Sequence, residues 1–109
     1  MKTIASIAAA LTFAACAAYA AEPADNYAKL CASCHGKDGA GHTKAGKKLE
    51  IKDLTDGAYQ KTFTDAQAFD SLKTGLKSKE GDDRMKSFAE KLSDDEIKGL
   101  VTYVRTLAK

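Results

Sequence analysis

Two cysteines three residues apart, with a histidine directly after the second, are the side chains of this sequence best suited to chemistry. They are Cys31, Cys34 and His35, in the stretch LCASCHGKDGAGH that runs from Leu30 to His42. Side chains of these types form disulfides, bind metal ions or attach a cofactor covalently. The rest of the sequence decides among these three chemistries.

Two of the three fit the sequence poorly. A redox-active Cys-x-x-Cys normally follows a strand in a βαβ unit, and no such strand is predicted here. A structural disulfide between Cys31 and Cys34 would close a loop too small to stabilise much. A zinc ion would also need His35 and His42. However, adjacent residues point about 100° apart on a helix, and the spacing usual between the cysteines and histidines of zinc fingers is absent.

Covalent attachment of haem uses all three side chains. Residues at i and i+3 face the same way on a helical turn, so both thiols can reach the two vinyl groups along one porphyrin edge. The imidazole can then bind the iron, and Cys-x-x-Cys-His is a specific signal for c-type haem. A flat apolar macrocycle also supplies interior to a chain without tryptophan. The sequence predicts one haem c on Cys31 and Cys34, with His35 as the proximal iron ligand.

Met85 is the candidate for the second axial ligand. Apart from Met1 it is the only methionine, and it lies in the polar stretch GDDRMKSF. A methionine that fills a core gap would belong to an apolar stripe, so ligation of iron is the better interpretation. The alternative ligand is His42, which follows His35 closely in a glycine-rich loop on the proximal side. The fallback ligands, if Met85 dissociates, are Lys77, Lys79 and Lys86.

The first 20 residues have the layout of a secretory signal peptide. A basic start is followed by an apolar run from Ile4 to Ala18, and small residues predict cleavage after Ala20. The run is short for a membrane span. Phe13 to Cys16 loosely resembles a lipoprotein box, so a lipid anchor on Cys16 is the alternative. We expect residues 21–109 to form one exported domain in the periplasm, without stable membrane insertion.

Helical patterns dominate the remainder of the chain. Residues 24–34 are helix-permissive, whereas the glycine-rich residues 36–56 are expected to form a loop. The capping box Thr64-Asp65-Ala66-Gln67 predicts a second helix that ends near Gly75. Its apolar residues are Phe69, Leu72 and Leu76.

A second capping box, Ser93-Asp94-Asp95-Glu96, predicts the last helix and places acidic side chains at the positive end of the helix dipole. Apolar residues then recur at helical spacing: Ile97, Leu100, Val101, Val104 and Leu107. No run alternates with period two for long enough to predict a sheet. The predicted fold class is therefore all-α.

Together these motifs resemble those of small bacterial class I c-type cytochromes. The resemblance rests on CASCHG at 31–36 with the following DGAG at 38–41, and on MKSFAEKLSDDEIKGLVTYVR at 85–105. It covers essentially residues 24–109. It implies a helical fold around one haem, whose first and last helices cross near Tyr27, Leu30, Leu100 and Tyr103.

The sequence departs from this family's pattern in two places. Many relatives carry a proline directly after the ligand methionine, where this chain has Lys86. Many also carry a proline in the proximal loop, but the only proline here is Pro23. Another backbone carbonyl, in the stretch 44–49, is therefore expected to accept the ring N–H of His35.

A haem iron with His35 and Met85 on opposite faces has no open position, so one-electron exchange between Fe(II) and Fe(III) is the remaining chemistry. The expected function is a monomeric periplasmic electron carrier, not an enzyme, that docks briefly with redox partner proteins. The alternative is a haem peroxidase or gas-responsive protein with a displaceable sixth ligand.

The charges of the chain bear on its partners. The formal net charge of +2 gives no electrostatic case for nucleic acid. A rim of lysines could meet an acidic redox partner, although the same charges also fit an ordinary solvated surface. The rim residues are Lys44, Lys47, Lys48, Lys52, Lys73, Lys77 and Lys79.

Overall fold

The computed structural model describes residues 21–109, so the predicted signal peptide and Cys16 lie outside the described residues. Within this range six helices and one hairpin follow in the order α1 (Pro23–Leu30), α2 (Ala32–His35), α3 (Lys44–Lys48), α4 (Gly57–Gln60), α5 (Asp65–Thr74), β1 (Leu76–Lys77), β2 (Asp83–Met85) and α6 (Asp94–Thr106). None of the helices found in residues 21–109 combines the length and the apolar character that crossing a bilayer requires.

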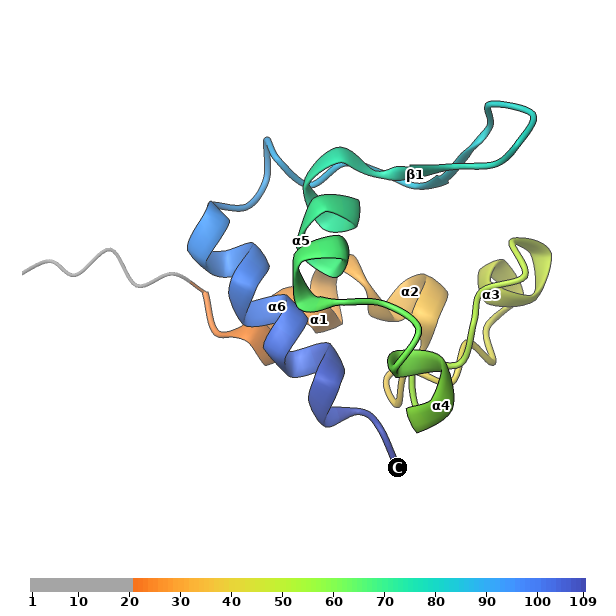
Figure 1. Cartoon of the computed structure of the whole chain (residues 1–109), viewed down its shortest axis with the longest axis horizontal. Coiled ribbons are helices and arrows are strands. Elements are labelled where there is room, and N and C mark those ends of the chain that lie inside the picture. The colour runs from red at the N-terminus through yellow and green to blue at the C-terminus, as the bar shows by residue number, and fades with distance from the viewer. Residues whose placement is uncertain (1–20) are drawn as a thin grey trace, which may run out of the picture.

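Helices α1 and α6 cross, as Figure 1 shows, and their contact forms the centre of the core. Tyr27 of α1 is buried together with Ile97 and Leu100 of α6. The rings of Tyr27 and Tyr103 pack at 5.0 Å between centroids, and Leu30 packs on the same cluster. The predicted crossing of the first and last helices is confirmed.

Both predicted capping boxes form. Thr64 begins α5 and exchanges hydrogen bonds with Gln67, and Ser93 begins α6 and exchanges them with Glu96. The Glu96 carboxylate also accepts a bond of 3.2 Å from Nδ2 of Asn26, which ties the start of α6 to α1. These bonds hold the pKa of Glu96 below its usual value, and the bond from the Ser93 backbone N–H has the largest effect.

The first predicted helix is divided into two. Cys31 has a backbone φ of −116° and separates α1 from α2. Helix α5 ends as expected at Gly75, whose φ is +83°. Beyond that glycine, Leu76 lies in a strand, so its predicted place on the second helix is wrong.

Three short elements depart from the predicted pattern. The segment 36–56 is not all loop, because Thr43 caps α3 by accepting a hydrogen bond from the Gly46 N–H. In the same way Asp56 caps α4 by accepting from the Ala58 N–H. Strands β1 and β2 pair antiparallel with Leu76 opposite Met85, and they are too short for an alternating pattern to reveal them.

Helix α3 packs on α2 through Gly46, the buried residue at its centre. A Cβ atom on Gly46 would overlap the Gly41 carbonyl oxygen and would lie 2.7 Å from that of Cys34. Both neighbours are backbone atoms, which cannot move aside as a side-chain end can. The separation of α3 from the segment that carries Cys34 is therefore set by the absence of a side chain.

Helix α3 ends in a Schellman motif. The Ile51 N–H donates to the Gly46 carbonyl at 2.9 Å, and the Glu50 N–H donates to the Lys47 carbonyl at 3.3 Å. The motif puts Glu50 in the left-handed region, with φ +53°, and it is the only non-glycine residue with positive φ among those described. Glycine is the usual residue at this position because it has no Cβ atom.

Gly46→Ala is predicted to destabilise the folded protein by about 2–3 kcal/mol, because the added methyl group overlaps two backbone carbonyls. The measurement is the free energy of unfolding from denaturant titration of the holoprotein. Gly57→Ala is the matched control, because its nearest contact would be an ordinary 3.5 Å to the Lys109 carbonyl. Equal effects of the two substitutions would contradict the close packing of α3 on α2.

Glu50→Gly is predicted to stabilise the protein by roughly 0.5–1 kcal/mol. Relief of the left-handed strain contributes ~1–2 kcal/mol, and the greater freedom of glycine in the unfolded chain offsets ~0.5–1 kcal/mol of it. Glu50→Gln removes the charge but keeps the Cβ atom, so its unfolding midpoint should stay near that of the wild type. A gain of equal size in both variants would assign the effect to charge instead of backbone strain.

Candidate functional site

The segment from Cys34 to Gly36 is held by its backbone. Three successive carbonyl oxygens accept hydrogen bonds from three separate places in the chain. These bonds are Thr43 Oγ1 to Cys34 (2.6 Å), the Gly41 N–H to His35 (2.7 Å) and Tyr27 Oη to Gly36 (2.6 Å). Burial, and to a smaller extent the nearby Cys31, raises the pKa of Tyr27 to about 12. The Tyr27 hydroxyl therefore remains a hydrogen-bond donor at neutral pH.

A cavity of about 690 Å³, including space at its open mouth, lies beside this segment. His35 and Met85 both line it, although 50 positions separate them in the sequence. The remaining lining is mostly apolar or aromatic: Leu54, Tyr59, Phe63, Leu72, Leu76, Val101 and Val104. The fold thus brings the two predicted axial ligands to one apolar cavity.

The two cysteines lie beside the cavity and do not line it. Cys31 is buried against the core cluster around Tyr27 and Phe88, whereas Cys34 is partly exposed. Both thiols are free. Burial, with a smaller effect of Cys34, raises the pKa of Cys31 to about 11, so Cys31 is a neutral thiol at neutral pH.

His35 lacks the hydrogen bond that was expected for it. Its Nδ1 atom is buried and has no partner among the described residues. The prediction that a carbonyl in 44–49 accepts the ring N–H is therefore wrong. Four of the six carbonyls in this stretch accept other bonds instead: those of residues 45, 46, 47 and 49 accept from Leu49, Ile51, Glu50 and Arg84.

The donor set of the cavity fits a haem. His35 and Met85 bring a ring nitrogen and a thioether sulfur to the same apolar cavity. Burial lowers the pKa of His35, which keeps the imidazole neutral and able to bind a metal ion. A neutral imidazole and a thioether are the ligand pair of haem iron in cytochromes c, and an apolar wall suits the porphyrin.

The alternative ligands lie away from this arrangement. His42 is exposed and does not line the cavity, and the same holds for Lys77, Lys79 and Lys86. Residues 21–109 contain no group of three or more His, Cys, Asp or Glu side chains that could hold a metal ion. The zinc site considered from the sequence therefore has no counterpart in this part of the chain.

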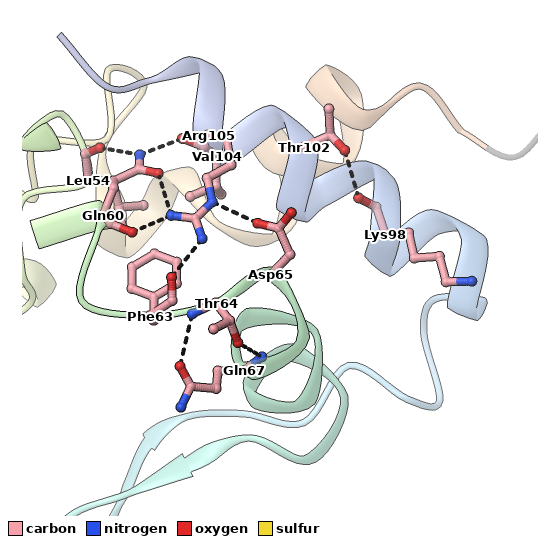
Figure 2. A network of polar contacts seen from close by, with 10 residues as sticks. All are labelled: Leu54, Gln60, Phe63, Thr64, Asp65, Gln67, Lys98, Thr102, Val104 and Arg105. Atoms are coloured by element: carbon pink, nitrogen blue, oxygen red, sulfur yellow. Dashed lines mark hydrogen bonds and ion pairs between the residues drawn. The ribbon is translucent and has the colours of Figure 1, made fainter.

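The wall formed by Tyr59 and Phe63 is fixed by a polar network, drawn in Figure 2. Gln60 is buried, and its Nε2 donates to the carbonyls of Leu54 (2.7 Å) and Val104 (2.8 Å). The Arg105 guanidinium donates to the carbonyls of Gln60 and Phe63 and covers the Phe63 ring at 4.4 Å. A further bond of 2.8 Å joins it to Asp65 at the start of α5.

Sequence reasoning missed several residues that shape the site. Thr43 and Gly46 stand three positions apart, like an N-cap and its partner, and this was the available signal for α3. Tyr59 and Phe63 are four positions apart, as on a helix face, but α4 is too short for such a pattern to be convincing. No local sequence pattern pointed to the role of Arg105, because its hydrogen-bond partners are 40 or more residues away in the sequence.

Comparison with known proteins agrees with the geometry. The family model described as cytochrome C oxidase, cbb3-type, subunit III matches residues 18–104. The chain is 34% identical over 99 residues to cytochrome c-553 of Nitratidesulfovibrio vulgaris (strain DSM 19637 / Miyazaki F), covering 81% of this chain and 90% of that protein.

Solved structures give the same result. The KustC0563 c-type cytochrome superposes with a TM-score of 0.70 at 31% identity, covering 81% of this chain and 99% of the other. A mutant of that protein gives 0.67 at 29% identity, with coverages of 79% and 98%. The fold expected from the sequence, a small helical cytochrome c fold, is confirmed. The chain belongs to the small class I c-type cytochromes, within the family described as cytochrome c oxidase, cbb3-type, subunit III.

Proposed function

We propose that this protein is a one-electron carrier with a single, covalently bound haem c. Cys31 and Cys34 form the thioethers to the two vinyl groups, and His35 and Met85 are the axial ligands of the iron. The observation that carries the proposal is that His35 and Met85 line one apolar cavity beside the two cysteines. The family membership supports the haem itself.

Each part of the site has a role in such a carrier. The haem, when bound, supplies an iron that cycles between Fe(II) and Fe(III). The soft thioether of Met85 favours Fe(II) and raises the reduction potential. The bonds to the carbonyls of Cys34, His35 and Gly36 keep the proximal side in one geometry in both oxidation states. With both axial positions held by side chains, no position remains for a substrate, so the protein is not an enzyme.

The proposal includes export and transient docking. Residues 1–20 serve as a signal peptide that is cleaved after Ala20, and residues 21–109 act as a single periplasmic domain without stable insertion in the membrane. A lipid anchor on Cys16 is the alternative. The carrier works as a monomer and meets its redox partner proteins through a small surface.

The docking surface proposed is the lysine rim. Lys77 and Lys79 on the hairpin are exposed, as are Lys44, Lys47, Lys48 and Lys52 near α3. Lys73 is less available, because it pairs with Asp94 at 3.2 Å and covers the Phe69 ring. Lys77 pairs with Asp83 at 3.7 Å, but its side chain is 71% exposed, and such pairs contribute little in water.

Optical spectroscopy of the exported protein tests the haem and its ligands. The wild type should show a Soret band, a pyridine haemochrome for one haem per chain, and the weak long-wavelength band of sulfur-to-iron charge transfer in the ferric state. Met85→Ala should abolish that last band and lower the reduction potential by on the order of 0.1 V, because a soft axial ligand is lost. The intact mass gives the cleavage site and the number of haems together.

Leu76→Ala is the matched control for Met85→Ala. Leu76 lines the same cavity and pairs with Met85 across the hairpin, but it offers no sulfur. This variant should therefore keep the charge-transfer band. A colourless wild type would contradict the haem. A wild type that binds carbon monoxide readily in the ferrous state would favour a gas-responsive protein or a peroxidase instead.

The double substitution Lys77→Glu and Lys79→Glu should slow reduction of an acidic redox partner about 3- to 10-fold at low salt, because charge guides the encounter. The difference should shrink as salt is added. Stopped-flow kinetics measure the rate. Lys98→Glu is the control, because Lys98 lies with Asp65 and Asp70 in a groove between α5 and α6. Lys98→Glu makes half the change in net charge, so slowing by about half as much on a logarithmic scale would assign the effect to net charge and remove the case for the rim.

A further inference from the structure

The backbone that carries Met85 is held on one side by the end of α5. Ser87 Oγ donates to the Lys73 carbonyl at 2.5 Å, and the Phe88 N–H donates to the Leu72 carbonyl at 2.9 Å. A Cβ atom on Gly75 would lie 2.7 Å from the Met85 carbonyl oxygen. These contacts fix the chain just after Met85, and they leave the hairpin before it to be held by other means.

Arg84 supplies a contact on that other side. It precedes Met85 in β2, and its Nη2 donates to the Leu49 carbonyl at 3.0 Å, across 35 positions of sequence. The same nitrogen lies 3.9 Å from a Glu50 carboxylate oxygen. Glu50 is 86% exposed, so this ion pair contributes little. The hydrogen bond to the carbonyl is the stronger contact.

The Leu49 carbonyl is available because of how α3 ends. Leu49 is the C-cap, and the Schellman motif satisfies the carbonyls of Gly46 and Lys47 but not that of the cap itself. Carbonyls at a helix C-terminus carry partial negative charge, which favours a cation there. A guanidinium donates such a bond while keeping its charge in water.

This contact joins the two sides of the cavity. Helix α3 packs through Gly46 directly on the segment that contains Cys34 and His35, while Arg84 and Met85 are neighbours on the hairpin. Figure 1 shows the hairpin reaching from α5 toward the side where α3 lies. One side chain therefore connects the hairpin that carries Met85 with the helix that positions the His35 segment.

We propose that Arg84 is a positioning residue for Met85: its bond to the Leu49 carbonyl restrains the hairpin and so keeps the thioether at the cavity. The inference rests on the proposed ligation of the haem iron by Met85. The residue after Met85 is Lys86 and not a proline, so the loop lacks the stiffness of a proline there, and Arg84 restrains it instead. Without that bond, the hairpin moves away from the cavity more often, and an external ligand takes the place of the thioether more easily.

Imidazole binding to the ferric holoprotein tests this assignment, because imidazole must displace the thioether in order to bind. Arg84→Gln should raise the imidazole affinity roughly 3- to 10-fold, the range expected for loss of one ordinary hydrogen bond whose donor is partly exposed. Arg84→Lys, which keeps the charge and one donor, should give an intermediate value. The free energy of global unfolding is measured alongside and should fall by no more than the free energy that corresponds to the same roughly 3- to 10-fold change, because the bond is absent both from the open hairpin and from the unfolded chain.

Glu50→Gln is the matched control. It removes the ion pair with Arg84 and leaves the bond to the Leu49 carbonyl, so the imidazole affinity should stay within about twofold of the wild type. An unchanged affinity in Arg84→Gln would overturn the assignment, and so would an equal rise in Glu50→Gln. A wild type without the sulfur-to-iron band would instead refute ligation by Met85, and the role of Arg84 with it.

Discussion

The direct contact of α3 with the backbone of the Cys34 segment is the constraint on which the site depends. Because Gly46 has no side chain, the two backbones meet, and Thr43 at the start of α3 can donate to the Cys34 carbonyl. The far end of the same helix presents the Leu49 carbonyl to Arg84. Helix α3 and its two capping residues, Thr43 and Leu49, thus contact both sides of the cavity, which makes α3 more important to the site than its length suggests.

The features predicted from the sequence are those encoded by neighbouring residues. The capping boxes at Thr64 and Ser93, the stripe of α6 and the Cys-x-x-Cys-His motif each depend on a few adjacent positions, and the helices follow them closely. The crossing of α1 and α6 was expected from the family resemblance and is present. The shared cavity of His35 and Met85 agrees with the predicted pair of ligands, which stays a prediction until the iron is observed.

The features that were missed depend on residues far apart in the sequence. The hydrogen bond expected for the His35 ring is absent, and the stretch assumed to be a loop is a helix in which the carbonyls of residues 45, 46 and 47 accept bonds from the following backbone. The hairpin has only two paired positions, and it exists because Gly75 turns the chain against the Met85 backbone. Local propensity carries no information about such contacts, so neither could be deduced from pattern alone.

The network around Gln60 and Arg105 also determines when the site can be completed. Chains emerge from synthesis with the N-terminus first, so Cys31 and Cys34 appear long before Val104 and Arg105. The wall of Tyr59 and Phe63 lacks its supports until the last helix has arrived. The segment from Cys31 to His35 is therefore accessible while the chain is still incomplete, and the cavity beside it closes only with the final turns of α6.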